Sequence, residues 1–182
     1  ELLDVLQELL DQSLLQRIET PAQDDANAPR FFMLETMREY ALARLAERHE
    51  LAVVEAAHAS YVRDLVEAAE PHLLGPDERR WSAQLDAEFG TIRAALAWAI
   101  VHDADTALRI AGALWTYWVL RVHVSEGRTW LDRAIAAGPN AAAAWRAKAH
   151  TAAALLAGLP GDVAATIQHA QEGATLARET GA

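Results

Sequence analysis

The sequence predicts a mainly α-helical chain with one small β-hairpin near its N-terminus, followed by an α-α superhelix of helical hairpins. Three observations predict this fold class. Apolar side chains recur at helical spacing over most of the 182 residues. Only two short segments, both within the first 35 residues, have the composition of strands. Turns that contain Gly or Pro interrupt the helical pattern at short intervals in the second half of the chain.

The first 35 residues alternate between helix and strand. Residues 1–12 form a predicted helix whose leucines and Val5 recur at helical spacing. Two short runs, 13–19 and 31–34, are predicted strands, and the polar segment 20–29 between them, which has two prolines, is a predicted loop. Helix, strand, loop, strand and helix are the order of the second half of a winged-helix domain, with the loop at the tip of the wing.

A second predicted helix follows the strands at once. Thr36 and Glu39 have the T-x-x-E spacing of a capping box, in which each side chain accepts a hydrogen bond from an otherwise unpaired backbone N–H. With this helix, residues 1–50 are interpreted as the C-terminal half of a winged-helix domain. Because the sequence begins inside a predicted helix and without Met, we expect the other half to precede it in a longer protein.

Residues 51–104 are predicted to be a helical connector. The apolar periodicity indicates helices over 51–70, 77–89 and 91–101. Gly90 lies between the last two of these helices and indicates either an interruption of the helical conformation or close packing.

Residues 105–182 are repetitive. Four predicted helices pair into two hairpins; they cover 106–122, 125–137, 141–159 and 163–180. The hairpins resemble tetratricopeptide repeats, whose helix–turn–helix units of about 34 residues stack through small side chains, although the spacing here is a little longer. Because a free-standing array needs about three such units, we expect the array to continue beyond this chain.

Three stretches carry a more specific resemblance. They are LLDQSLLQRIE with FFMLETMREYALARLAE, then LDAEFGTIRAALAWAI, then IAGALWTYWVLRVHVSEGRTWLDRAI, and together they span most of residues 1–137. In order and spacing they resemble the region downstream of the nucleotide-binding domain in bacterial NB-ARC-like, signal-transduction-ATPase regulators of transcription, of the LuxR or antibiotic-regulator type. The resemblance implies a winged helix that packs on the ATPase core and relays its nucleotide state. ATP or ADP and Mg²⁺ are implied only for a nucleotide-binding domain outside this chain.

The same family carries a Met-His-Asp nucleotide sensor at the start of the last winged-helix helix. The matching positions here are Met33, Leu34 and Glu35. Leu34 has no group that could hydrogen-bond a phosphate, and Glu35 keeps the acidic group at a different length. We therefore interpret Leu34 as a core residue and keep nucleotide contact by these three positions as the alternative.

The charge balance argues against nucleic acid as a partner of this chain. Acidic residues outnumber basic ones by 26 to 16, for a net charge of −10, whereas DNA binding draws its affinity from Lys and Arg on phosphates. The predicted helix 1–12 has the position of the DNA-recognition helix of a winged-helix domain, and it carries Asp4, Glu8 and Asp11 and no basic residue. The wing carries Asp24 and Asp25. We expect no direct nucleic-acid binding, an expectation that salt-dependent retention on DNA would contradict.

No segment suggests a membrane or a secreted location. No apolar run reaches the length that spans a bilayer, and no signal segment opens the sequence. Cysteine is absent, which excludes disulfides and thiolate chemistry. We expect a cytoplasmic, globular protein with no membrane partner.

The sequence predicts no enzyme and no metal site within this chain. A P-loop needs Gly-Lys-Ser/Thr to hold phosphates, and the only lysine is Lys148, which follows an alanine. The seven histidines include no H-E-x-x-H pattern. His169 and Glu172 share a helix face without a third ligand.

Aromatic and arginine side chains at the first predicted hairpin form a candidate surface for a partner or effector: Trp115, Tyr117, Trp118, Arg121 and Arg128. Aromatic residues on repeat helices can line a concave groove for a peptide or a small molecule. The alternative is that the tryptophans pack between hairpins. Tyr117, Arg121 and Arg128 are the positions that we expect to face solvent.

The sequence therefore predicts a non-catalytic regulatory, sensor and protein-interaction segment of a multidomain signalling ATPase that regulates transcription. Its expected partners are the nucleotide-binding domain of the same protein and a protein or small effector on the repeats. The alternative is a stand-alone helical-repeat scaffold that binds proteins.

Overall fold

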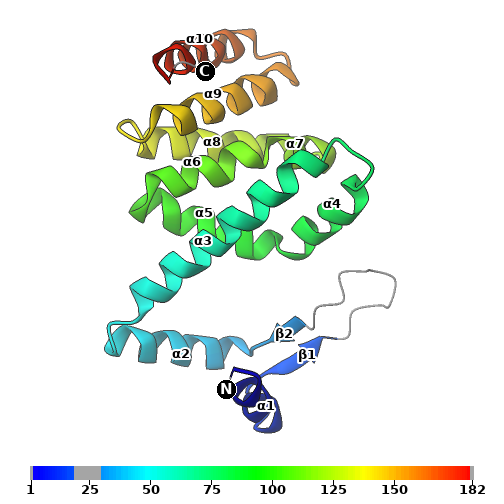
Figure 1. Ribbon diagram of the computed structural model, residues 1–182, viewed down its shortest axis with the longest axis vertical. Coiled ribbons are helices and arrows are strands. Elements are labelled where there is room, and N and C mark those ends of the chain that lie inside the picture. The colour runs from blue at the N-terminus through cyan, green and yellow to red at the C-terminus, as the bar shows by residue number, and fades with distance from the viewer. Residues whose placement is uncertain (1, 19–29, 181–182) are drawn as a thin grey trace. The chain divides into compact units, whose positions relative to one another are not determined.

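A computed structural model of the chain describes residues 2–18 and 30–180. These residues form ten α-helices, one short 3-10 helix and two strands (Figure 1), which confirms the predicted class of a mainly α chain with a small hairpin. The elements are α1 (Leu2–Asp11), β1 (Gln16–Ile18), β2 (Arg30–Phe32), α2 (Glu35–Glu47), α3 (Leu51–Ala69), η1 (Glu70–His72), α4 (Glu78–Ala87), α5 (Phe89–His102), α6 (Ala104–Ala113), α7 (Trp115–Leu120), α8 (Val124–Ala137), α9 (Ala143–Gly158) and α10 (Val163–Thr180).

The chain divides into two compact units, Glu1–Val54 and Glu55–Ala182, and the division falls within α3. We call them the N-terminal unit and the helical unit.

In the N-terminal unit, α1 leads into an antiparallel hairpin. Gln16 pairs with Phe32 and Arg17 with Phe31. Both strands are shorter than predicted. Strand β1 begins late because Ser13 adopts a left-handed conformation with φ of 59° and the chain turns there. The predicted wing tip, residues 20–29, lies outside the described residues.

The predicted capping box is wrong. Helix α2 begins at Glu35, and the residue before it, Leu34, makes no capping hydrogen bond through its side chain. Thr36 is therefore already inside the first turn, where its hydroxyl is not placed to cap the helix.

None of the residues 3–18 and 31–54 of the N-terminal unit is buried. Several large apolar side chains are instead exposed, among them Leu3 at 78%, Phe32 at 48% and Leu34 at 47%. The interpretation of Leu34 as a core residue is therefore wrong.

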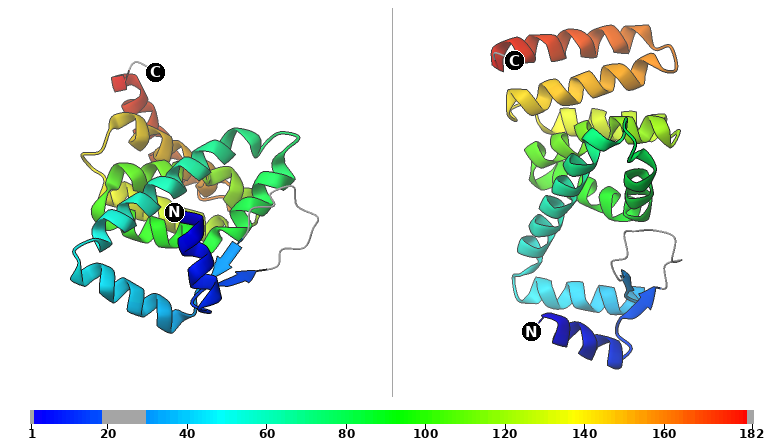
Figure 2. Two further views of the ribbon diagram at one scale, coloured as in Figure 1. Left: turned by 60° about the horizontal axis from the view of Figure 1, so that its bottom comes forward. Right: turned by 45° about the vertical axis from the view of Figure 1, so that its right-hand side comes forward.

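The helical unit is built from stacked hairpins. Helix α6 packs on α8 and α9, α8 packs on α9, and α9 and α10 form the closest pair (Figure 2). Helices α6 and α9 begin at Ala104 and Ala143, and α8 and α10 at Val124 and Val163, so both repeat after 39 residues. This interval is longer than the roughly 34 residues of a tetratricopeptide repeat.

The predicted single helix over 106–122 is two helices. Leu114 has φ of −86° and ψ of −2°, and it separates α6 from α7. With this break, the side chains of Leu114, Tyr117 and Trp118 all reach the core, where each is at most 1% exposed. Tertiary packing decided this geometry, since the local apolar pattern is continuous across it.

The interpretation of Gly90 is also wrong. The break lies two residues earlier, at Glu88, and Gly90 is inside α5. A Cβ atom built on Gly90 would meet nothing within 4 Å, so no close packing requires a glycine there.

A continuous hydrophobic core runs through the helical unit from α3 to α9. Its largest fully buried side chains are Trp118, Tyr117, Leu73, Leu85, Ile92, Leu96, Leu108, Ile110, Leu114, Leu131, Leu156 and Val62. Their burial removes apolar surface from water, which is the main favourable term in folding.

Candidate functional site

The three sensor-like positions lie at the link between β2 and α2. Leu34 has an extended backbone at the helix entrance, with φ of −58° and ψ of 140°. Glu35 opens the helix, where a carboxylate is favourable near the positive end of the helix dipole, and it lies 3.6 Å from the guanidinium of Arg38. Met33 is half-buried.

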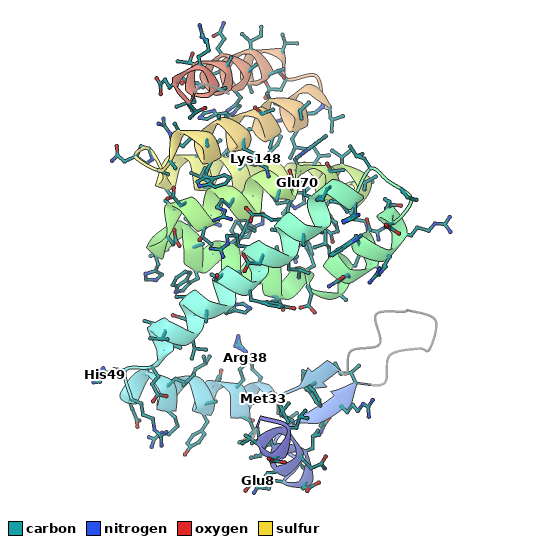
Figure 3. All side chains as sticks on the ribbon, in the orientation of Figure 1. Glu8, Met33, Arg38, His49, Glu70 and Lys148 are labelled. Atoms are coloured by element: carbon teal, nitrogen blue, oxygen red, sulfur yellow. The ribbon has the colours of Figure 1, made fainter. Side chains whose placement is uncertain are left out.

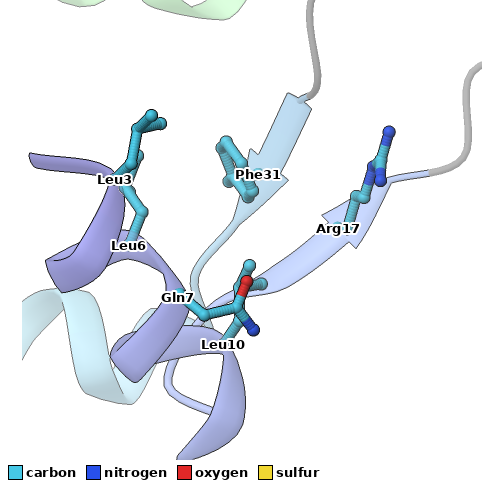
Figure 4. A pocket seen from close by; sticks show the side chains of 6 residues that line it. All are labelled: Leu3, Leu6, Gln7, Leu10, Arg17 and Phe31. Carbon is cyan, nitrogen blue, oxygen red and sulfur yellow. The ribbon is translucent and has the colours of Figure 1, made fainter.

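A shallow apolar cavity of about 240 Å³ opens between α1 and the hairpin (Figure 4). Its lining is mostly apolar and comes from Leu3, Leu6, Gln7, Leu10, Arg17 and Phe31. Phe31 and Phe32 are neighbours on β2, and alternate strand residues point to opposite faces. Phe31 lines the cavity, whereas Phe32 is exposed elsewhere.

At the junction of α7 and α4, Tyr117 and Arg121 share one carboxylate. The Tyr117 hydroxyl donates to Asp86 Oδ1 at 2.8 Å, and Arg121 donates to both Asp86 oxygens at 3.0 and 2.5 Å. Burial, with the hydrogen bond to Asp86, raises the pKa of Tyr117. Tyr117 is 1% exposed, so the expectation that it faces solvent is wrong.

Trp118 lies deeper in the same region. Its indole is fully buried, and its Nε1–H has no hydrogen-bond partner among the described residues. A Cβ atom on Gly127 of α8 would come within 2.5 Å of the indole ring and 2.8 Å of Leu156. Gly127 therefore provides the space that Trp118 occupies. Trp115, three residues earlier, is only half-buried and packs against the core from its edge.

Arg128 of α8 binds Asp162, the residue before α10. It donates to Asp162 Oδ2 at 2.6 Å, and Asp162 Oδ1 accepts from the backbone N–H of Ala165 at 3.1 Å. The backbone hydrogen bond and then the Arg128 guanidinium lower the pKa of Asp162. The aspartate caps the helix and anchors the arginine at the same time. The five predicted surface residues thus do not form one open patch.

Sequence reasoning missed a second set of contacts, which link helices far apart in sequence. Arg109 of α6 makes two hydrogen bonds to Glu67 of α3, at 2.8 and 2.6 Å, and its guanidinium lies 4.6 Å from the ring centre of Trp145 on α9. Lys148, also on α9, reaches Glu70 at 2.5 Å (Figure 3). Lys148 passes over Gly112, whose Cβ would lie 3.3 Å from its side chain.

A similar contact joins α5 and α8. Arg93 of α5 donates twice to Glu126 of α8, both at 2.6 Å, and lies 4.3 Å from the ring centre of Phe89. Trp130 donates to the same carboxylate at 3.1 Å. The hydrogen bond from Arg93 is the largest cause that lowers the pKa of Glu126. No fixed spacing links such partners in the sequence, so only the fold could reveal them.

These charged groups join helices that lie far apart in the sequence. Among the described residues, no group of three or more His, Asp or Glu side chains is arranged to hold a metal ion. Within residues 2–18 and 30–180, no helix is long and apolar enough to cross a membrane.

Comparison with known proteins gives a consistent set of relatives. No family model matches the chain, and no solved structure is significantly similar to it. The chain is 35% identical over 134 residues to a protein of Mycobacterium tuberculosis (strain H37Rv) named "Putative HTH-type transcriptional regulator Rv0890c". Proteins with the same description from M. tuberculosis strain CDC 1551 and from Mycobacterium bovis match at the same identity.

The match covers 71% of this chain and 14% of each relative. The chain thus spans about one seventh of the length of these curated relatives. Over most of its residues, this chain is similar to one segment of much longer proteins that are named as HTH-type transcriptional regulators.

Proposed function

We propose that this chain is a non-catalytic regulatory and protein-interaction segment of a multidomain signalling ATPase that controls transcription in the cytoplasm. The names of the relatives support a regulator of transcription. The ATPase part of the proposal rests on the resemblance to NB-ARC-like regulators, and the nucleotide and Mg²⁺ belong to a domain outside this chain.

One observation carries the proposal: large apolar side chains of the N-terminal unit are exposed and none of its residues 3–18 and 31–54 is buried, whereas the helical unit has a continuous buried core. A unit that leaves Leu3 78% exposed beside an apolar cavity gains free energy when another element covers that surface. We assign this role to the nucleotide-binding part of the same protein, so that the N-terminal unit transmits its state.

In this proposal the helical unit provides the rigid surface for a protein or a small effector. Its helices are held by ion pairs that cross between hairpins, such as Arg109 with Glu67 and Lys148 with Glu70. A partner bound to one hairpin would therefore meet a preorganised surface, which lowers the entropic cost of binding. The net charge of −10 disfavours DNA as that partner.

The test is a pair of variants in the intact regulator. Phe31→Asp places a charge in the cavity, whereas Phe32→Asp places the same charge on the neighbouring, exposed residue. A carboxylate in this cavity, even with Arg17 opposite it, opposes the covering of the apolar lining by another element. We expect Phe31→Asp to abolish the difference in reporter transcription between the ATP-bound and ADP-bound regulator, and Phe32→Asp to leave that difference within about twofold of the unmodified protein.

Circular dichroism at 222 nm and the ATP hydrolysis rate serve as controls for folding and for the nucleotide-binding part. Equal behaviour of the two variants would contradict the coupling role of the N-terminal unit. An intact protein that neither binds nor hydrolyses ATP would instead support the alternative, a helical-repeat scaffold that binds proteins.

A further inference from the structure

Two histidines face one another between the last two helices. His150 of α9 and His169 of α10 approach through their Nδ1 atoms, which are 3.1 Å apart. The rings are tilted by 47°, with centroids 5.3 Å apart. His150 is 8% exposed and the side chain of His169 17%, so both rings lie within the contact between the helices.

This geometry allows only one proton between the two facing nitrogens. A neutral imidazole has one N–H donor and one bare acceptor nitrogen. At 3.1 Å, one Nδ1 donates and the other accepts. If both rings were charged, both Nδ1 atoms would be donors, and two donors and two positive charges would meet at the same distance, in a place largely closed to water.

Charged side chains from several segments surround the pair. Asp132 of α8 lies 3.8 Å from His169 Nε2, and the charge of His169 contributes to lowering the pKa of Asp162, in the turn before α10. On α10, Glu172 favours the charged form of His150, whereas Arg146 on α9 opposes it. Burial first, and then the charge of His169, lower the pKa of His150.

Because folding lowers the pKa of His150, the stability that this residue contributes falls as the pH falls. A histidine whose pKa is lowered by folding binds fewer protons in the folded than in the unfolded state. Its contribution to stability is therefore fully present above the ordinary value of 6.5 and is lost as the pH falls below that value.

The pair is particular to the last hairpin. The positions 39 residues earlier in the repeat are Ala111 on α6 and Trp130 on α8. Ala111 is fully buried and Trp130 packs against the core from its edge. The earlier hairpin thus has a small residue and a large apolar one where the last hairpin has two titratable rings.

We propose that His150 and His169 form a pH-sensitive latch, which holds α10 on α9 while the two facing nitrogens share one proton and which opens when a second proton binds. The latch is independent of the function proposed above. Its opening would expose the surface of α9 that α10 covers. This surface includes Ala147, His150 and Thr151, which lie against Gly173 of α10.

Hydrogen exchange of the full chain tests the latch. Protection of the amides of α10 is compared with that of α6 at pH 7.5 and 5.5, after correction for the intrinsic pH dependence of amide exchange. We expect the protection of α10 relative to α6 to fall about tenfold at the lower pH, the effect of one pKa unit on an opening equilibrium. In His169→Asn the second charge cannot form and only the burial of His150 remains, so we expect a smaller fall than in the unmodified chain.

Two further variants complete the design. His49→Asn removes a histidine from an exposed, left-handed position that asparagine tolerates, and it should leave the tenfold fall unchanged. The double variant His150→Ala with His169→Trp introduces the residues of the earlier hairpin. Because it removes both rings, it should lose the pH effect, with less than a twofold fall, and it serves if His169→Asn alone does not fold. Equal protection at both pH values in the unmodified chain, or an undiminished fall in both latch variants, would overturn the proposal.

Discussion

The N-terminal unit and the helical unit contain similar amphipathic helices but bury them to very different extents. In α1, Leu3 is 78% and Val5 52% exposed, whereas Leu108 and Ile110 in α6 are fully buried. Helix α1 lines a cavity together with the two-stranded hairpin, and α6 is covered by α5, α8 and α9. The difference lies in the number of covering elements, because an apolar stripe specifies that a helix needs a partner and does not supply one.

The largest expected effect breaks the core of the helical unit. Trp118→Ala removes a fully buried indole and should cost about 3–5 kcal/mol of unfolding free energy. Phe32→Ala in the N-terminal unit removes an aromatic ring that is 48% exposed and should cost about 0.5 kcal/mol or less. Urea unfolding followed by circular dichroism at 222 nm measures both. Similar costs would mean that the two units do not differ in packing as described.

A pair of glycines gives an intermediate effect with opposite signs. At Gly127, a Cβ atom would meet Trp118 at 2.5 Å, and at Gly90 it would meet nothing within 4 Å. Gly127→Ala should therefore destabilise the chain by about 1–3 kcal/mol through overpacking, despite the better helix propensity of alanine. Gly90→Ala should stabilise it by up to about 1 kcal/mol.

The thermal midpoints of these two variants are the readout. A destabilised Gly90→Ala would show that this glycine is needed for a reason other than packing. A stabilised Gly127→Ala would show that the Trp118 ring can move aside at little cost.

The smallest expected effect compares two arginines with the same kinds of partner. Arg109 binds Glu67 of another helix and stacks on Trp145, and Arg44 binds Glu47 of its own helix and stacks on Tyr40. Arg109→Gln should lower the unfolding free energy by about 1–2 kcal/mol. Its ion pair with Glu67 is partly shielded from water, and with the contact to Trp145 the side chain joins three helices.

Arg44→Gln should cost only a few tenths of a kcal/mol, because both members of its ion pair are more than half exposed. Urea unfolding at low and at high salt separates the charge contribution from packing. A cost for Arg44→Gln that equals that for Arg109→Gln would show that linking distant helices adds nothing to an ion pair.

Local elements were largely predictable because they depend on short-range periodicity. The helices near 51–70, 125–137 and 163–180 agree with α3, α8 and α10 to within one or two residues. The errors occur where a local signal does not fix the geometry. Thr36 has the spacing of a helix cap and lies inside the helix, and the apolar run over 106–122 hides the break at Leu114.

The candidate site was predicted less well, because residue type does not reveal partners distant in the chain. Tyr117, Arg121 and Arg128 were recognised as notable, yet Asp86 and Asp162, which bind them, were not. His150 and His169, 19 residues apart, met only when α9 and α10 folded back on each other. Gly127 became interpretable only once Trp118 was seen against it.

The sequence by itself determined the helical class, the short hairpin, the acidic charge and the approximate repeat, because propensity, periodicity and composition are local properties. Only the tertiary structure decided which apolar faces are covered, where α6 ends and α7 begins, and which charged groups meet. Those outcomes depend on contacts between residues as far apart as Glu70 and Lys148, and the free energy of such contacts exists only when the helices are packed.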